Sequence, residues 1–140
     1  MKKSHLLGTL AAVTLLPQVA TAGCDGPIEP APVYEEVLNQ ICVREAEFLH
    51  DQGVLFYDAN TLEHWATGYI PNAIFFGVAD WKALLPEDKS TPMVFYCVNP
   101  LCTASEMAAR QVMKLGYTNV YQMPDGIIGW RMTGHRVELP

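Results

Sequence analysis

Short hydrophobic runs recur along the chain, and polar or amphipathic stretches separate them. Four runs have the length and composition of buried strands, at residues 54–57, 73–76, 93–96 and 119–123. Four intervening segments have helical spacing or helix-start signals, at residues 61–66, 80–85, 104–115 and 127–132. Strands that alternate with helices predict an α/β fold, a central parallel sheet flanked by helices on both faces.

The first 22 residues have a different pattern from the rest. Lys2 and Lys3 precede an apolar stretch at residues 6–16, and Ala-Thr-Ala ending at Ala22 fits a cleavage site. This pattern predicts a signal peptide over residues 1–22, with cleavage after Ala22 and a periplasmic or secreted protein. The apolar stretch is too short for a mature membrane span, so none is expected.

The residues that follow the predicted signal peptide are expected to contain one domain. Residues 23–40 are expected to form an extended lead-in and the start of a first helix, because Pro, Gly and acidic residues give way to helical spacing over residues 34–49. Residues 41–140 are expected to form the folded domain. Gly53 follows that helix at a position typical of a helix C-terminus.

Charge and cysteine content limit which partners the chain can bind and how its cysteines can pair. The formal net charge is −6, which argues against binding nucleic acid or an anionic membrane surface. Of the four cysteines, sequence order favours a Cys24–Cys42 disulfide and leaves Cys97 and Cys102 as a local pair. No His, Cys or carboxylate spacing matches a zinc motif, so we predict no metal and no cofactor.

Cys97 ends the most hydrophobic of the predicted strands. Asn99 and Pro100 then predict a turn, and Thr103 with Glu106 matches a capping box that opens a helix. This order places a thiol at the carboxyl end of a parallel strand, over a helix N-terminus, where N–H groups and the helix dipole favour a thiolate. The alternative is a buried structural cysteine.

Two further stretches, taken with this loop, resemble the rhodanese (sulfurtransferase) family. Residues 58–73 run from an Asp that closes a strand to Gly-Tyr-Ile-Pro-Asn-Ala, where the family has Gly-His-Ile-Pro-Gly-Ala. Residues 116–120 match its Gly-Tyr-x-x-Val, and residues 125–130 read Asp-Gly-Ile-Ile-Gly-Trp where it has Gly-Gly-x-x-x-Trp. The resemblance extends over residues 41–137, nearly the whole predicted mature chain.

The resemblance implies sulfane-sulfur transfer on a rhodanese-like α/β fold. Cys97 is then the nucleophile that takes sulfur from a small donor as a persulfide and passes it to a thiol acceptor, because the thiolate is the attacking species. Asp58 supports the site. The loop implied to bind substrate continues through Val98, Asn99, Pro100, Leu101, Cys102 and Thr103.

The loop departs from the family at two positions. Pro100 stands where the family often has Gly, and Cys102 stands where it often has Arg, which leaves no cation in the loop for thiosulfate. The same lack of Arg argues against a phosphatase. We therefore interpret Cys102 as a candidate resolving thiol that attacks a persulfide on Cys97.

Two other functions fit the same residues. The Cys97–Cys102 pair could serve thiol–disulfide exchange, with a periplasmic redox protein as partner. The domain could instead be a rhodanese-like binding module without catalysis.

Overall fold

The computed structural model describes residues 36–140. The predicted signal peptide, most of the predicted lead-in and Cys24 lie outside these residues. The described elements, in chain order, are β1 (Asn39–Gln40), α1 (Val43–Asp51), β2 (Leu55–Asp58), α2 (Leu62–Ala66), β3 (Ile74–Phe75), the 3₁₀ helix η1 (Trp81–Leu84), β4 (Met93–Tyr96), α3 (Ala104–Lys114), β5 (Val120–Met123) and α4 (Gly126–Met132). Within residues 36–140, no helix is long and apolar enough to cross a bilayer.

The five strands form one sheet in the order β1-β5-β4-β2-β3, and each neighbouring pair is parallel. The predicted central parallel sheet is therefore confirmed. β4 lies in the middle, and all four of its side chains are buried, which explains its uninterrupted hydrophobic sequence. Asp58 and Met123 are aligned with Tyr96 in the register, so three strands end together beside Cys97.

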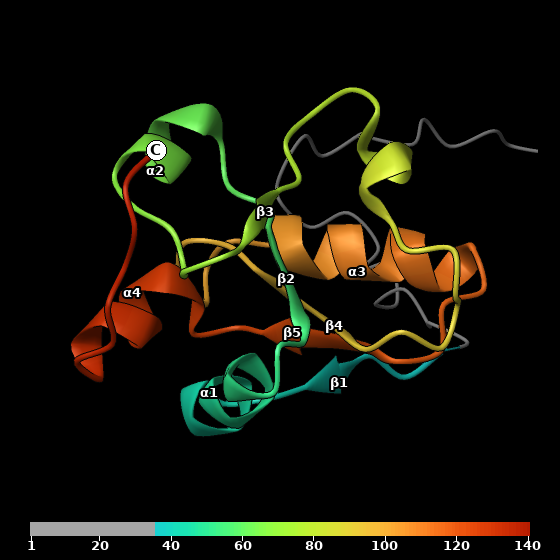
Figure 1. Ribbon diagram of the computed structural model, residues 1–140, viewed down its shortest axis with the longest axis horizontal. Helices are drawn as coiled ribbons and strands as arrows, with labels where there is room; N and C mark the ends of the chain where they lie inside the picture. The colour runs from blue at the N-terminus through green and yellow to red at the C-terminus, as the bar shows by residue number, and fades with distance from the viewer. Residues whose placement is uncertain (1–35) are drawn as a thin grey trace, which may run out of the picture. The chain divides into compact units, whose positions relative to one another are not determined.

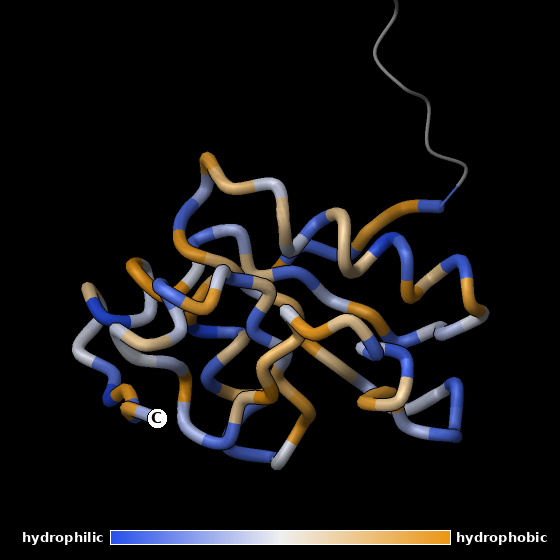
Figure 2. The backbone as a smooth tube through the Cα atoms, turned by 90° about the horizontal axis from the view of Figure 1, so that it is seen from above, coloured by the Kyte–Doolittle hydropathy of each residue, from blue (hydrophilic) through white to orange (hydrophobic). Residues whose placement is uncertain are grey.

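Side chains of β4 alternate between two hydrophobic cores. Met93 and Phe95 pack with α3 on one face, whereas Val94 and Tyr96 pack with α1 and α4 on the other. Figure 1 shows α3 on one side of the sheet and α1 on the opposite side. Figure 2 shows hydrophobic and hydrophilic stretches alternating along the backbone. Helices thus cover both faces, as predicted.

The first helix was expected too early in the chain. A strand, β1, occupies Asn39–Gln40, and α1 begins only at Val43. The edge of β5 needs a hydrogen-bonding partner, and β1 supplies it: the Ile41 N–H donates to the Gln122 carbonyl at 2.9 Å. Tertiary pairing overrides helical spacing here. The predicted end of the helix is confirmed, because α1 stops at Asp51 and Gly53 has a φ of 75°.

Candidate functional site

Cys97 follows β4 directly and lies at the carboxyl edge of the sheet. Its side chain is 1 % exposed. Edges of this kind carry the binding sites of parallel α/β sheets. The position is the one that the sequence predicts, but the thiol lies beneath the loop instead of on its surface.

The loop after Cys97 is a tight turn that holds itself together. The Cys102 N–H donates to the Asn99 carbonyl at 3.1 Å, and the Leu101 N–H donates to Asn99 Oδ1 at 3.0 Å. Leu101 stands at the tip and is 90 % exposed. The predicted turn is confirmed, and two of its backbone N–H groups are engaged in hydrogen bonds within the loop.

The predicted capping box at Thr103 does not form. Thr103 has helical backbone angles (φ −90°, ψ −4°), and its side chain makes no capping hydrogen bond. A capping residue needs an extended backbone to reach the first free N–H groups. Glu106 instead accepts a hydrogen bond from Arg110 Nε at 2.9 Å, one turn along α3.

The opposite side of the loop is fixed by the start of α4. The Ile127 N–H donates to the Cys97 carbonyl at 2.8 Å, and the Ile128 N–H donates to the Val98 carbonyl at 3.1 Å. Gly126 precedes them with a φ of 62°. Two free N–H groups of one helix N-terminus therefore hold the first two residues of the loop.

The Cys97 sulfur points beneath the loop toward the base of α3. It donates to the Cys102 carbonyl at 3.2 Å and lies 3.2 Å from Ser105 Oγ. Burial and the Cys102 side chain raise the pKa of Cys97, and the hydroxyl and backbone N–H of Ser105 offset only part of that increase. Cys97 is therefore mainly a thiol at neutral pH.

Cys102 has the opposite character, although both cysteines are free. Burial acts to raise its pKa, but interactions with the Cys97 side chain and with the N–H groups of Ala104 and Val98 outweigh burial, so the pKa of Cys102 is lowered. The Cys102 side chain is also partly exposed. The N–H groups of Ala104 and Val98 therefore favour a Cys102 thiolate, and the Ser105 N–H favours a Cys97 thiolate. Burial and Cys102 outweigh Ser105, so the expectation that Cys97 is held as a thiolate is wrong.

Asp58 lies close to the loop and is fully buried. Its Oδ1 accepts the Asn60 N–H at 2.8 Å, whereas Asp58 Oδ2 and Asn60 Nδ2 have no hydrogen-bond partner among residues 36–140. Burial raises the pKa of Asp58, and its contacts with Tyr96 and Asn60 lower it by less. The negative charge of Asp58 in turn raises the pKa of Cys102.

Two residues of the site were not identified from the sequence, Ser105 and Gln122. Ser105 is fully buried beside Cys97, and Gln122 Nε2 donates to Ser105 Oγ at 3.1 Å. The only sequence signal is a polar residue at an inward-facing position: Gln122 interrupts an otherwise apolar strand, and Ser105 lies on the buried face of α3.

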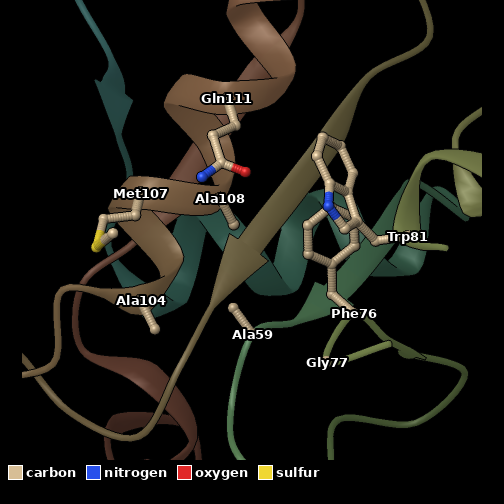
Figure 3. Close-up of a pocket in the computed structure, with 8 residues that line it drawn as sticks. All are labelled: Ala59, Phe76, Gly77, Trp81, Ala104, Met107, Ala108 and Gln111. Carbon is tan, nitrogen blue, oxygen red and sulfur yellow. The ribbon is translucent and has the colours of Figure 1, made fainter. Parts of the chain in front are cut away.

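An apolar pocket of about 260 Å³ lies beside the loop. Figure 3 shows Phe76 and Trp81 on one side of this pocket and the α3 side chains on the other. Its complete lining is Ala59, Phe76, Gly77, Trp81, Ala104, Met107, Ala108 and Gln111. Ala59 follows Asp58 and Ala104 begins α3, so the pocket adjoins both sides of the site.

Polar ligands for ions are scarce around the site. Among residues 36–140, no group of three or more His, Cys, Asp or Glu side chains is arranged to hold a metal ion. No Lys or Arg occurs in the sequence between Lys89 and Arg110. Cys42 is a further free thiol on the surface, and its predicted partner, Cys24, is outside the described residues.

Known proteins resemble this chain over most of the described residues. The family profile described as "Rhodanese-like domain" matches residues 45–133. A tRNA uridine(34) hydroxylase of Hamiltonella defensa subsp. Acyrthosiphon pisum (strain 5AT) is 30% identical over 101 residues, which are 67% of this chain and 28% of that protein. The chain therefore spans little more than a quarter of this relative.

A shorter relative and a solved structure show the same likeness. The thiosulfate sulfurtransferase GlpE of Pseudomonas savastanoi pv. phaseolicola (strain 1448A / Race 6) is 27% identical over 98 residues, 68% of this chain and 89% of that protein. The crystal structure of a thiosulfate sulfurtransferase from Pseudomonas aeruginosa has a TM-score of 0.63 and 23% identity, and the match covers 73% of this chain and 20% of that one.

Proposed function

Because the chain belongs to the rhodanese-like domain family, we propose that it is a sulfane-sulfur carrier that stores sulfur as a persulfide on Cys97. Cys102 serves as a second thiol, which exchanges sulfur between Cys97 and the solvent. One observation carries this proposal: Cys97 is 1 % exposed and donates its S–H beneath the loop, while Cys102 is the partly exposed thiol and has a lowered pKa.

The transfer requires two displacement steps. First, the Cys102 thiolate attacks the outer sulfur of a persulfide donor R–S–SH, so that Cys102–S–SH forms as the donor S–S bond breaks and R–S⁻ leaves. Cys97 then attacks that same outer sulfur, and its S–H proton passes to the departing Cys102 sulfur. The products are a Cys97 persulfide and a Cys102 thiol, with no net oxidation.

An organic persulfide is the donor class that we propose. The pocket beside the loop is mainly apolar, which suits the carbon portion of such a donor. A dianion such as thiosulfate finds no Lys or Arg in the loop, and losing one charge-assisted contact costs about 1.5–3 kcal/mol. Thiosulfate should therefore be the poorer donor.

Thiol–disulfide exchange is the second candidate function. The observation that favours it is the direct interaction between the two thiols, which raises the pKa of Cys97 and lowers that of Cys102. Attack of Cys97 on the inner sulfur of the Cys102 persulfide, with loss of the Cys97 proton to the leaving sulfide, would give a Cys97–Cys102 disulfide and release HS⁻ or H₂S.

We also propose that the protein acts in the periplasm or outside the cell. The support is the signal-peptide pattern of residues 1–22. Exported thiols meet an oxidising compartment, so a periplasmic redox protein is the partner class that we propose for keeping both thiols reduced.

Intact-mass measurement tests the sulfur-carrier function. The reduced protein is mixed with an organic persulfide or with thiosulfate at equal concentration, and the mass is followed with time. We expect wild type to gain one sulfur faster from the organic persulfide. Cys97→Ser should trap sulfur on Cys102, whereas Cys102→Ser should take up sulfur at least tenfold more slowly. Cys42→Ser is the control that removes an exposed thiol outside the loop.

Each other outcome identifies a different function. Loss of two hydrogens with sulfide release, and no sulfur gain, would support thiol–disulfide exchange. No reaction of either loop cysteine in the folded, reduced protein would support a binding module. Equal sulfur uptake by wild type and Cys102→Ser would contradict the role of Cys102.

A further inference from the structure

We propose that Ser105 is a positioning residue, oriented by Gln122 and Gln40, whose hydroxyl stays hydrogen-bonded to the Cys97 sulfur and stabilises its anionic form. This inference rests on the proposed function, because it explains how a buried Cys97 becomes nucleophilic. Three polar side chains connect the sulfur to the edge of the sheet, and together they define a chain of hydrogen bonds that we call the amide relay: Ser105, Gln122 and Gln40.

The direction of each hydrogen bond follows from counting hydrogens. Cys97 has one S–H, and the carbonyl of Cys102 can only accept, so that hydrogen is directed at the carbonyl 3.2 Å away. The 3.2 Å contact between Ser105 Oγ and the Cys97 sulfur must then be donated by the Ser105 hydroxyl. Ser105 therefore already points a donor at the atom that becomes negative.

Gln122 keeps the Ser105 hydroxyl in that orientation. Its Nε2 donates to Ser105 Oγ at 3.1 Å, which occupies the oxygen and directs the hydroxyl hydrogen to Cys97. Ser105 is fully buried, and Gln122 is 4 % exposed. A buried polar group without a hydrogen-bond partner is costly, so the orientation of the Ser105 hydroxyl toward Cys97 is strongly preferred.

Gln40 determines which way the Gln122 amide faces. Gln40 and Gln122 are paired in the register of β1 and β5, which run side by side (Figure 1). Gln40 Nε2 donates to Gln122 Oε1 at 2.9 Å. A flipped Gln122 amide would place its oxygen against Ser105 and draw the hydroxyl hydrogen away from Cys97. The short strand β1 therefore has a role at the site besides completing the sheet.

No charged group in the relay competes with this effect. Cys102 is the titratable group that acts on the Cys97 sulfur from the loop, and Asp58 at the end of β2 acts in turn on Cys102. α3 and β5 contribute the uncharged Ser105 and Gln122. The relay thus supplies a donor without adding a charge that would need its own partner.

The test is a pH titration of the Cys97 thiolate by its ultraviolet absorbance. The background replaces Cys24, Cys42 and Cys102 with Ser, which leaves one thiol and keeps the carbonyl of residue 102. We expect Ser105→Ala to raise the pKa of Cys97 by about one unit or more, since one hydrogen bond to an anion is lost. Ser105→Thr keeps the hydroxyl and should restore most of the shift.

Two Gln122 variants test the orientation. Gln122→Glu reverses the last hydrogen bond, because a carboxylate accepts from Ser105, and should raise the pKa of Cys97 at least as much as Ser105→Ala. Gln122→Leu should raise it less, and should add little in the Ser105→Ala background because both changes act through one hydroxyl. Gln111→Leu removes a matched exposed glutamine from α3 and should leave the pKa unchanged.

The result separates this inference from the proposed function. If Ser105→Ala folds with wild-type circular dichroism and titrates like its parent, the relay does not stabilise the Cys97 anion, and the inference is wrong. Thr133→Ala removes a hydroxyl that bonds only helix carbonyls of α4, and it controls for loss of stability alone. A shifted titration in a protein that never takes up sulfur would keep the inference and overturn the proposed function.

Discussion

Gly126 is the residue at which a single methyl group should disrupt the cysteine loop. Its φ is +62°, and a Cβ there would lie 2.5 Å from the Cys97 carbonyl oxygen and 2.6 Å from the Val98 carbonyl carbon. Both are backbone atoms, which cannot move aside alone. Gly126→Ala must therefore displace either the loop or the start of α4, and with it the two hydrogen bonds that α4 donates to the loop.

The expected loss of stability has two parts. A left-handed backbone costs Ala about 1–2 kcal/mol, and reduced freedom of the unfolded chain returns about 0.4–1 kcal/mol. Forcing a methyl group into packed backbone adds roughly 1–3 kcal/mol. Gly53 isolates the first part, because its φ is +75° and a Cβ added there would have nothing within 4 Å. Gly126→Ala should therefore lose about 1–3 kcal/mol more than Gly53→Ala.

Urea unfolding measures the free energy of unfolding of each variant. The rate at which a small alkylating reagent labels Cys97 measures whether the loop has been displaced. Gly126→Ala should label faster than wild type, because a displaced loop exposes a thiol that is now 1 % exposed. Gly53 lies just after the C-terminus of α1, so Cys97 in Gly53→Ala should be labelled at the wild-type rate. Equal losses of stability and equal labelling rates in the two variants would refute the steric reasoning.

Two further predictions concern the buried groups around the thiols. Asp58→Asn should stabilise the protein by roughly 0.5–2 kcal/mol at neutral pH and should lower the pKa of Cys102, because the Asp58 charge that raises it is removed. Because the pKa of Asp58 is raised, wild type loses stability as the pH rises through that pKa. When urea unfolding is repeated at decreasing pH, the difference in free energy of unfolding between Asp58→Asn and wild type should therefore shrink toward zero. A difference that does not change with pH would contradict this. Tyr96→Phe should lower the free energy of unfolding in urea by about 1–3 kcal/mol, because the Ile70 N–H loses the Tyr96 hydroxyl, its acceptor at 3.1 Å. An unchanged urea midpoint would count against this prediction.

Much of the fold follows from local sequence. A short continuous hydrophobic run that is bounded by turn signals is typical of a central parallel strand, so β4 and the position of Cys97 were predictable. The helical segment predicted at residues 61–66 also forms, and Thr61 caps it, because its Oγ1 accepts the His64 N–H. The β1 strand could not be predicted, because Asn39–Gln40 is extended only where β5 offers an open edge.

The orientation of the two sulfurs depends on contacts that are distant in sequence. Asn99 folds the turn locally, but Ile127, thirty residues after Cys97, fixes the Cys97 carbonyl. Ser105 and Gln122 then determine the polar surroundings of the Cys97 sulfur. Loop spacing alone predicted where the thiols lie and did not predict which of them has the lowered pKa.

The order of the two pKa values gives the proposed transfer a direction. In thiol exchange, a more acidic thiol is the better leaving group, and a less acidic thiolate is the stronger nucleophile. Cys102 has the lowered pKa and Cys97 the raised one, so displacement of Cys102 by Cys97 is faster than the reverse once Cys97 loses its proton. Sulfur taken up at the partly exposed Cys102 should therefore move inward, to a thiol that solvent barely reaches. The same order makes Ser105 important, because the inward step waits on deprotonation of a buried thiol whose pKa is raised by burial and by Cys102 and lowered by the hydroxyl and the backbone N–H of Ser105.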